Sequence, residues 1–383
     1  MKNNYERNTN SDLCKKRWMK KLTEICNIQY GYAFDSGCFT EKCSYPPLIR
    51  IRDVKRGFSE TYYSGEYSKE YVVHAGDLLI GMDGEFNIAR WKSVDGLLNQ
   101  RVCKLTAKEG TDEEYLRFAL VKALKIIENK TAFVTVKHLS AKELNKLELD
   151  LPCIEKQSLR AKILTKLERI IWHRENELRE LDNLIRARFV EMFGDISTGH
   201  YKYETQKLGE VAEVGSSHRV FTTEFVDEGI PFYRGTEIGE LANGQKPSDP
   251  YCISEEHYNR LANDSTKPKV GDLLMPSICN KGQVWMVDTE EPFYYKDGRV
   301  LCISPNREIY DSRYLQYFMR VKTEVEYPKM GSGSTFAEFK IFLLKDFDVL
   351  TPPKDIQEAF ADFVKQVNKS KVILPKSSFN VII

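Results

Sequence analysis

The tetrapeptide Gly-Asp-Leu-Leu occurs twice in this chain, at residues 76–79 and again at residues 271–274. Each copy follows a turn-forming stretch and opens a short apolar run, which is typical of a tight turn that leads into a buried strand. Two isolated turns of this kind can arise by chance. If the flanking sequence repeats as well, the chain must contain two copies of one domain.

The flanking sequence does repeat, and in the same order. Leu22 and Leu208 open the first matched segments and lie 186 positions apart, while Pro152 and Pro352 open the last and lie 200 positions apart. Further matches fall between them: YPPLIRIRDVKRG with IPFYRGTEIGE, the two Gly-Asp-Leu-Leu copies, Arg101-Val102 with Arg299-Val300, and DEEYLRFALVKAL with DSRYLQYFMRVKT. Such a period is too long for a solenoid, so the sequence predicts a tandem duplication of a domain.

Each copy is predicted to be mainly β-structure, because short apolar runs such as LIRI, DLLI, QVWMV and VLCI lie between Gly, Asp and Pro turns. Each then ends in one amphipathic helix. In the first copy, Thr111 and Glu114 have the spacing of a capping box that opens this helix. Apolar residues at helical spacing follow, and we expect them in the core: Leu116, Leu120, Leu124 and Ile127 in the first copy, and Leu315, Phe318, Met319 and Val325 in the second.

A long helix is predicted between the copies, from Glu155 to about Met192, because no Pro or Gly interrupts this stretch. About 34 helical residues would span roughly 50 Å. The apolar seam, with a gap at Arg174 that a stutter would absorb, consists of Ile163, Leu167, Ile170, Leu178, Leu181, Ile185 and Phe189. A second helix is expected at the equivalent place in residues 352–370, with Ile356, Phe360, Phe363, Val364 and Val367 apolar. The two helices could pair and hold the domains a fixed distance apart.

Composition excludes several classes of protein. The chain has 383 residues, 42% of them hydrophobic and 30% charged, and no apolar run of membrane-spanning length, which indicates a globular protein that is cytoplasmic by default. The nine cysteines show no CxxC pair, and we expect reduced thiols rather than a zinc site or disulfides. The net charge of +1 argues against coating of nucleic acid but allows local basic patches.

No catalytic motif is evident in the sequence. There is no GxxxxGK[ST] loop, no GxGxxG, and no Asn/Asp-Pro-Pro-Tyr/Phe stretch of the kind a base aminomethyltransferase would need. Asp83 and Glu85 have no counterpart pair in the second copy, so we interpret them as turn residues. Ser216 and Ser217 beside His218 lack an identifiable acid partner. We therefore predict a protein that is not an enzyme and that binds neither metal nor cofactor.

Recognition of DNA is the function that the polar residues favour. Arg, Asn and Gln can make bidentate bonds to base edges, while Lys and Arg contact phosphate; a merely solvated surface remains the alternative for each residue. The candidate DNA-binding residues are Arg50, Arg52, Lys55, Arg56, Asn87, Arg90 and Lys92 in the first copy, with Tyr62 and Tyr63 near the first cluster, and Arg219, Arg234, Asn280, Lys281, Gln283 and Arg299 in the second.

The pattern GDLLIG…NQRVCKL, followed by ELNKLELDLPCIEKQSLRAKILTKLERI and later by PPKDIQEAFADFVKQVNKSK, resembles the DNA-specificity subunit of type I restriction–modification systems, from about Leu22 to Lys371. The resemblance implies an α+β fold with two β-rich target-recognition domains in tandem, each reading one half of a bipartite DNA site. It implies that two long conserved helices form an antiparallel coiled coil, which separates the domains. The expected boundaries are residues 1–152 for the first domain, 153–194 for the central helix, 195–351 for the second domain, and 352–383 for the distal helix and tail.

The resemblance also implies partners. Two methyltransferase subunits would dock on the helices, along the seam of the central helix, and carry S-adenosylmethionine; translocase/nuclease subunits, which need ATP and Mg²⁺, would join for cleavage. One feature departs from the family: the second helix stops near Ser370, and Pro375 forbids its simple continuation. Three alternatives stay open, namely a truncated or silent specificity cassette, a coiled-coil scaffold that binds only protein, and a self-contained nuclease or methyltransferase.

Overall fold

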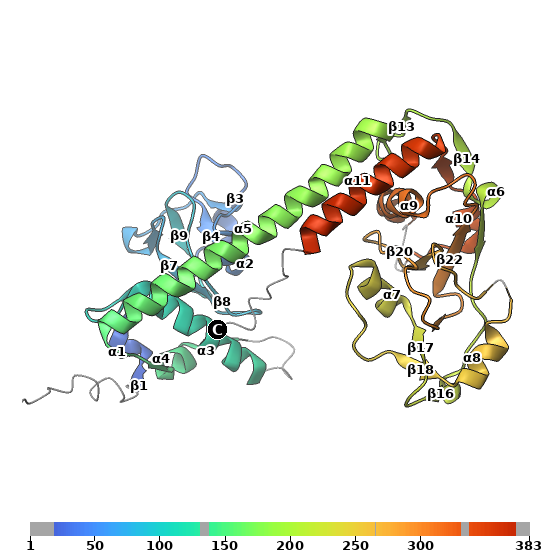
Figure 1. The fold of residues 1–383 in the computed structure, drawn as a ribbon. Helices are drawn as coiled ribbons and strands as arrows, with labels where there is room; N and C mark the ends of the chain where they lie inside the picture. Colours follow the sequence, from blue (N-terminus) through green and yellow to red (C-terminus); the bar gives the residue numbers. More distant parts are fainter. Residues whose placement is uncertain (1–18, 131–137, 265, 331–336, 373–383) are drawn as a thin grey trace, which may run out of the picture. The chain divides into compact units, whose positions relative to one another are not determined.

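The computed structural model describes residues 19–130, 138–264, 266–330 and 337–372 (Figure 1). The chain forms two compact units that divide between Glu175 and Asn176, inside the long helix α5 (Ile154–Phe193). The division therefore falls within the segment that was expected to stand apart as a central helix. Pro375 and the tail around it lie outside the described residues.

The first unit is built around an antiparallel sheet in the strand order β2-β10-β7-β8, beside smaller sheets β4-β9-β6, β3-β5 and β1-β11. Its strands are β1 (Met19–Lys21), β2 (Cys26–Tyr30), β3 (Phe39–Thr40), β4 (Leu48–Ile49), β5 (Tyr62–Tyr63), β6 (Val72–Val73), β7 (Leu78–Gly81), β8 (Asn87–Arg90), β9 (Gly96–Leu98), β10 (Val102–Ala107) and β11 (Glu148–Asp150). Its helices, besides the first part of α5, are α1 (Leu22–Ile25), α2 (Ile51–Arg56), α3 (Glu113–Lys130) and α4 (Ala141–Lys146), with 3-10 turns at Ser36–Cys38 and Lys69–Tyr71.

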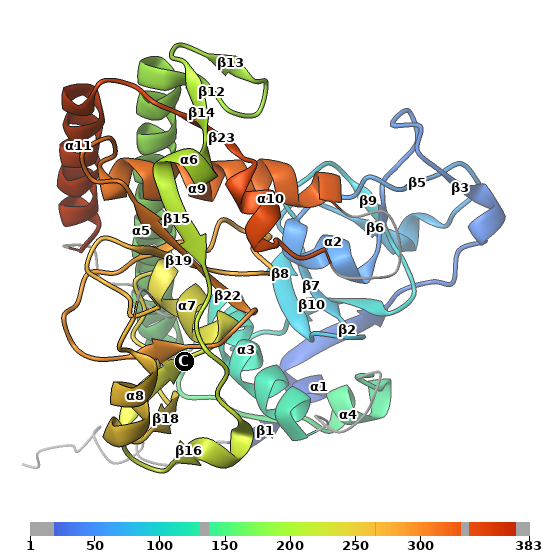
Figure 2. The same ribbon diagram turned by 90° about the vertical axis from the view of Figure 1, so that its right-hand side faces the viewer.

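The second unit has a central antiparallel sheet in the order β15-β22-β19-β20, a second sheet β16-β18-β17-β21, and the pairs β14-β23 and β12-β13 (Figure 2). Its strands are β12 (Gly194–Asp195), β13 (His200–Tyr201), β14 (Thr205–Lys207), β15 (Ala212–Gly215), β16 (Phe225–Val226), β17 (Ile230–Tyr233), β18 (Tyr251–Ile253), β19 (Leu273–Pro276), β20 (Trp285–Met286), β21 (Tyr294–Tyr295), β22 (Val300–Pro305) and β23 (Asp348–Leu350). Its helices are α6 (Leu208–Val211), α7 (Gly235–Ala242), α8 (Glu255–Leu261), α9 (Ser312–Glu326), α10 (Ile341–Lys345) and α11 (Lys354–Val372), with 3-10 turns at Thr222–Glu224 and Tyr327–Met330.

The two central sheets share one topology, in which β15, β22, β19 and β20 take the places of β2, β10, β7 and β8. In each unit the amphipathic helix, α3 or α9, packs its apolar face on this sheet. Leu116, Leu120 and Leu124 join the core of the first unit, as predicted. Leu315, Phe318 and Met319 do the same in the second. The predicted tandem duplication and α+β class are therefore confirmed.

The repeated Gly-Asp-Leu-Leu segment is one turn built twice. Gly76 and Gly271 have positive φ angles of 98° and 92°, which favour glycine. Asp77 holds the turn by accepting a bond from His74 N at 2.9 Å, and Asp272 accepts one from Lys269 N at 2.8 Å. The two leucines that follow are fully buried in each copy. The tetrapeptide thus encodes a local turn and the start of a core strand.

The repeated Pro-x4-Gln segment ties the start of one helix to another. The carboxamide of Gln157 donates to Pro152 O and Gly110 O and accepts from Asp112 N at 2.9 Å. Gln357 makes the equivalent bonds to Pro352 O, Ile309 O and Asp311 N. Both side chains are buried, so each must satisfy its polar atoms internally, which explains why the same residue stands at both places.

The expected capping box at the start of α3 is wrong in one detail. Tyr115 N donates to Asp112 Oδ1 at 2.9 Å, so Asp112 caps the helix rather than Thr111. Asp311 caps α9 in the same way, by accepting from Arg313 N and Tyr314 N. Asp112 and Asp311 occupy matched positions in the two copies. The Ser/Thr-x-x-Glu pattern instead predicted Thr111, the residue before Asp112, as the cap.

Helices α5 and α11 run antiparallel within the second unit, as expected (Figure 1). Phe360, near the start of α11, lies 5.4 Å from both Phe189 and Phe193 between ring centroids, whereas Lys371, near its end, bonds Asp182 at 2.5 Å. The described part of α11 therefore accompanies the last stretch of α5, from about Asp182 to Phe193.

The predicted seam of α5 meets two different environments. Ile185 and Phe189 are buried in the core of the second unit and Leu181 packs against it, so the side chains of Ile185 and Phe189 are not an exposed docking surface. Ile163 and Ile170 are exposed, while Leu167 and Leu178 are half-buried. In this half of the helix the buried residues are Gln157, Ala161 and Ile171, because the packed face lies about one residue away from the predicted heptad register.

Candidate nucleic-acid interface

An arginine at the N-cap of a short helix occurs at the same place in each unit. Arg50 precedes α2 and Arg234 precedes α7, and each donates its backbone N–H to an acid three residues later, Asp53 at 2.9 Å and Glu237 at 2.8 Å. Both acids are almost fully buried. The acid satisfies the orphan amide and fixes the helix start, so the preceding arginine is held at a defined point of the fold.

Side-chain contacts hold Arg234 in place in addition to its backbone bond to Glu237. Its guanidinium donates to Glu237 Oε1 at 2.5 Å and lies 4.4 Å from the ring centroid of Tyr251, in a cation–π contact. Burial alone would raise the pKa of Glu237, but the bonds from Arg234 outweigh it and hold that pKa below its usual value. The acid is therefore ionised, and the pair presents a planar, oriented guanidinium.

The other cations of α2 point to solvent. Arg52 pairs with Asp53 at 3.6 Å and bonds Thr61 Oγ1, Lys55 stands 3.9 Å from Glu85, and Arg56 stands 3.4 Å from Glu60. The pairs of Lys55 and Arg56 are exposed on both sides, and such pairs contribute little to stability and exchange readily for another anion. The structure thus brings the predicted cluster together on one short helix, with the Tyr62–Tyr63 strand β5 in the same unit.

The predicted residues on β8 and just after it divide into two kinds. Asn87 and Lys92 lie beside α2: Asn87 is close to Gly81 of β7, and the stem of Lys92 covers Gly57 at the end of α2. Arg90 instead bonds the carboxylates of Glu113 and Glu114 and donates to Gly76 O at 2.7 Å. Because its guanidinium ties β8 to the start of α3, we assign Arg90 a structural role.

In the second unit the predicted residues form two groups. Asn280, Lys281 and Gln283 share the loop between β19 and β20, where Gln283 Oε1 accepts from Lys281 N at 3.0 Å and the Gln283 side chain lies beside Gly239 of α7. This loop therefore adjoins the helix that Arg234 precedes.

Arg219 and Arg299 flank another turn, since Arg219 Nε lies 3.2 Å from Asp297 Oδ2, two residues before Arg299. Arg299 itself is ion-paired with Glu338. Its counterpart in the first unit, Arg101, was matched by the repeat but not proposed as a site residue. Arg101 contacts His138 at 2.9 Å and Asp83 at 3.7 Å. Arg101 and His138 lie 37 residues apart in sequence, so only the fold brings them together.

His218 has the acid partner that the sequence did not reveal. His218 Nε2 lies 2.8 Å from Asp264 Oδ2, and this bond, with bonds from Thr266, lowers the pKa of Asp264 to about 2. The neighbouring hydroxyls are engaged elsewhere, because Ser216 Oγ donates to Val300 O and Ser217 Oγ to Tyr295 O. The arrangement therefore lacks the serine–histidine bond that a hydrolytic triad requires.

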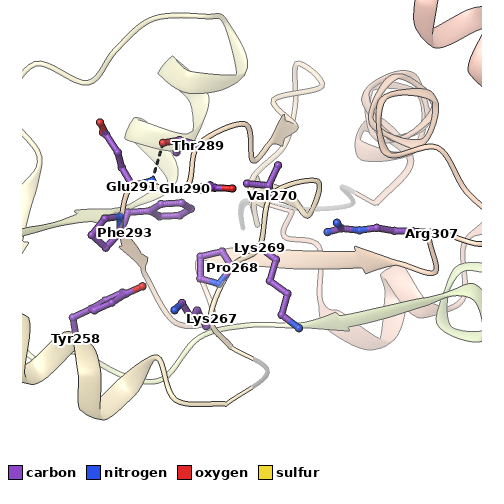
Figure 3. A pocket seen from close by; sticks show the side chains of 11 residues that line it. Tyr258, Lys267, Pro268, Lys269, Val270, Thr289, Glu290, Glu291, Phe293 and Arg307 are labelled. Atoms are coloured by element: carbon purple, nitrogen blue, oxygen red, sulfur yellow. Dashed lines mark hydrogen bonds between the residues drawn. The ribbon is translucent and has the colours of Figure 1, made fainter.

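A cavity of about 340 Å³ opens in the second unit (Figure 3). It contains none of the residues that the sequence singled out. Its lining mixes apolar, acidic and basic side chains: Tyr258, Lys267, Pro268, Lys269, Val270, Thr289, Glu290, Glu291, Pro292, Phe293 and Arg307. Arg307 is paired with Asp272 of the Gly-Asp-Leu-Leu turn at 3.4 Å, so the cavity lies beside a structural element rather than beside the arginines described above.

Among the described residues, no group of three or more His, Cys, Asp or Glu is placed to hold a metal ion. The described cysteines carry free thiols, and burial raises the pKa of Cys103 and Cys302 to about 12 and that of Cys279 to about 11. Such thiols are protonated and unreactive near neutral pH. No helix in the described part of the chain has the length and apolar character needed to cross a membrane.

Comparison with known proteins gives a consistent picture. The model of the family described as "Type I restriction modification DNA specificity domain" matches residues 15–182 and again residues 201–382. The chain is 41% identical to the type I restriction enzyme EcoBI specificity subunit of Escherichia coli over 152 residues, which is 39% of this chain and 32% of that protein. It is 22% identical to the MjaVIII specificity subunit of Methanocaldococcus jannaschii over 346 residues, covering 85% of this chain and 79% of that one.

The fold is similar to that of a solved structure. The S subunit of a type I restriction–modification system from M. genitalium superposes with a TM-score of 0.55 at 13% identity, over 94% of this chain and 91% of the other. At this identity the likeness concerns the fold alone. The two family matches coincide with the two copies of the repeat.

Proposed function

This chain belongs to the family of type I restriction modification DNA specificity domains, and from that membership we propose that it is the DNA-recognition subunit of a type I restriction–modification complex. Each repeat reads one half of a bipartite, asymmetric DNA target. The observation that carries the proposal is the paired N-cap arginine, Arg50 and Arg234, on equivalent helices beside loops that differ. Two unlike domains in one chain suit two unlike half-sites, whereas a symmetric dimer suits a palindrome.

The proposed reading surface of the first domain is α2 and the neighbouring part of β8, with Arg50, Arg52, Lys55, Arg56, Asn87 and Lys92. In the second domain it is α7 with Arg234, the loop between β19 and β20 with Asn280, Lys281 and Gln283, and the turn that Arg219 and Arg299 flank. Arg90 is left out because two carboxylates hold its guanidinium. Arginine at a fixed helix terminus and amides on a flanking loop supply the bidentate donors that base edges need.

Catalysis is assigned to partners. Two methyltransferase subunits dock on the helices and bring S-adenosylmethionine, and translocase/nuclease subunits that use ATP and Mg²⁺ join for cleavage. This chain contributes recognition and a docking surface and binds no cofactor. The support from this chain is that Ser216 and Ser217, beside the His218–Asp264 pair, keep both hydroxyls bonded to backbone carbonyls, away from His218.

The alternatives gain no support from the fold. A silent cassette with a failed second helix does not agree with α11, which packs Phe360 and Val364 into the core of the second unit. A scaffold that binds only protein leaves the matched arginines of α2 and α7 without a role.

Domain exchange tests the proposal. Residues 201–350 are replaced by the equivalent segment of another family member, and methylated sites are mapped in cells that carry the methyltransferase partners. We expect one half of the target to change and the other half and the methylation level to remain. The reciprocal exchange of residues 22–150 is the matched control and should change the opposite half. A change in both halves from either exchange would show that the domains are not independent readers.

A further inference from the structure

Arg101 and Arg299 occupy one position in the duplicated fold. Arg101 stands immediately before β10, and its carbonyl accepts a bond from Met82 N at 2.9 Å. Arg299 stands immediately before β22, and its carbonyl accepts from Ser277 N at 2.8 Å. Met82 and Ser277 are the residues that follow β7 and β19. Each arginine therefore sits where the central strand of its sheet begins, against the start of the loop that leaves the neighbouring strand.

Each guanidinium is anchored on one side by an acid, and the acid comes from a different part of the fold in each domain. Arg101 lies 3.7 Å from Asp83 and 2.9 Å from His138, and Asp83 also bonds His138. Arg299 pairs with Glu338, which lies 2.6 Å from Lys340. The acids are less exposed than the arginines: Asp83 and Glu338 are 26% and 20% exposed, against 51% and 60% for Arg101 and Arg299. The remaining donors of each guanidinium thus face solvent.

The backbone of Arg101 adopts a conformation that is energetically unfavourable for a residue with a Cβ atom. Its φ of 68° is the only positive value at a non-glycine position among the described residues. Glycine would adopt this conformation freely, whereas a residue with a Cβ is disfavoured there. In the same turn the buried Asn99 Oδ1 has no hydrogen-bond partner. A strained conformation of this kind persists only where the surrounding structure holds the residue in place. Such residues cluster at functional sites, so the strain at Arg101 motivates a hypothesis of function.

We propose that Arg101 and Arg299 each bind a backbone phosphate of the DNA and set the register of their domain on its half-site. The proposal rests on the proposed function as a DNA reader. The loops that leave β7 and β19 beside the arginines differ between the copies, with Asp83 and Glu85 in one and Asn280, Lys281 and Gln283 in the other. Residues that differ suit bases that differ. An arginine that both copies hold by its backbone at the start of the same core strand suits the one feature that all half-sites share, which is the phosphate backbone.

The neighbouring carboxylates act on this contact in two opposing ways. Asp83 and Glu338 orient the guanidinium, as an ion pair does, but they also repel a phosphate. Lys340 pairs with Glu338 at 2.6 Å and offsets part of that repulsion in the second domain, whereas His138 contacts both Asp83 and Arg101 in the first. The amide variants Asp83→Asn and Glu338→Gln keep an oxygen acceptor for the arginine and remove the negative charge. We therefore expect both variants to bind DNA at least as tightly as wild type.

The test uses the full chain and a labelled random-sequence duplex, so that no knowledge of the target is needed. Affinity is measured as a function of salt, because each phosphate contact contributes about 0.9 to the slope of log affinity against log salt. We expect Arg101→Gly and Arg299→Ala each to reduce the slope by about 0.9, and the double variant by about 1.8. Arg260→Ala removes a cation of α8 that is at least as exposed as Arg101 and Arg299, serves as the matched control and should leave the slope unchanged.

Arg101→Gly separates binding from folding, since glycine suits the backbone there. We expect its thermal midpoint to equal or exceed that of wild type while DNA binding weakens. A lower midpoint with an unchanged salt slope would identify Arg101 as a structural staple and overturn the proposal. Equal losses in Arg260→Ala would show that net charge rather than position matters, with the same consequence. If wild type itself binds no duplex, the proposed function fails; if wild type binds and the variants match it, only this inference fails.

Discussion

Phe360 joins helix α11 to the rest of the second unit, and its removal should uncouple them. The side chain is fully buried, and its ring centroid lies 5.2 Å from that of Tyr317 and 5.4 Å from those of Phe189 and Phe193. These partners come from α9 and from the end of α5. The Phe360→Ala substitution therefore opens a cavity where three helices meet, at the point that fixes the antiparallel pair.

The expected cost follows from the burial. Replacing a buried Phe by Ala destabilises a protein by about 3–5 kcal/mol, through lost transfer energy and the cavity that remains. Because 1.4 kcal/mol is a factor of ten, amide exchange in α9 and α11 should accelerate roughly 100- to 3,000-fold where it follows opening of the whole unit.

Hydrogen exchange read by mass spectrometry is the suitable assay, since it reports each helix separately. Peptides of α3 serve as the internal control and should exchange as in wild type, because α3 belongs to the other unit. The matched variant is Phe342→Ala, at a phenylalanine of α10 that is mostly exposed, and it should change exchange by less than threefold. If Phe360→Ala accelerates exchange no more than Phe342→Ala does, α11 is not held by this contact and the reasoning fails.

Three further predictions concern single side chains. Arg234→Ala should weaken binding of the target by about 1–3 kcal/mol and relax specificity in one half only, as read from affinities for duplexes with single base changes; uniform weakening would instead indicate a phosphate contact. Arg90→Ala should destabilise the first unit by about 1–2 kcal/mol in urea unfolding, because it removes the guanidinium that pairs with both Glu113 and Glu114, and should leave DNA affinity unchanged. Asp264→Asn should lower stability at neutral pH. The depressed pKa of Asp264 gives a contribution that is complete above the unfolded value of 3.8 and is lost as pH falls towards about 2, so the gap between variant and wild type should close in that range.

Local hydrogen-bonding motifs are the part of the fold that the sequence predicts well. The Gly-Asp-Leu-Leu turn and the Pro-x4-Gln segment each make their bonds within a few residues or to the start of an adjoining helix, so the same residues recur wherever the same element recurs. The stripes of α3 and α9 follow equally from helical periodicity. A duplicated chain doubles these signals, and for that reason the tandem architecture was accessible from the residues alone.

Contacts between distant segments were not accessible in this way. Asp264 lies 46 residues from His218, and His138 lies 37 residues from Arg101, so no spacing rule pairs them. On α5 two isoleucines, Ile170 and Ile171, are adjacent in the sequence. The heptad pattern predicted Ile170 for the packed seam, but Ile170 is exposed and Ile171 is buried. Which of two adjacent apolar residues faces inward depends on the neighbouring elements rather than on the helix itself. The roles of the candidate residues towards DNA remain predictions.

The exposed apolar side chains on the first half of α5 lead to the last prediction. Leu159, Ile163, Ile170 and Trp172 are each about half or more exposed, and Trp172 lines an open groove of about 530 Å³ together with Ile88 and Thr165. Large apolar side chains that are exposed in this way can form a site for another chain. We expect the isolated protein to self-associate and the methyltransferase partners to suppress this. Trp172→Ala combined with Ile170→Glu should reduce the concentration-dependent mass seen by light scattering. Phe221→Ala, at a residue as exposed as Trp172, is the matched control and should not. A wild-type chain that stays monomeric at every concentration would refute the prediction.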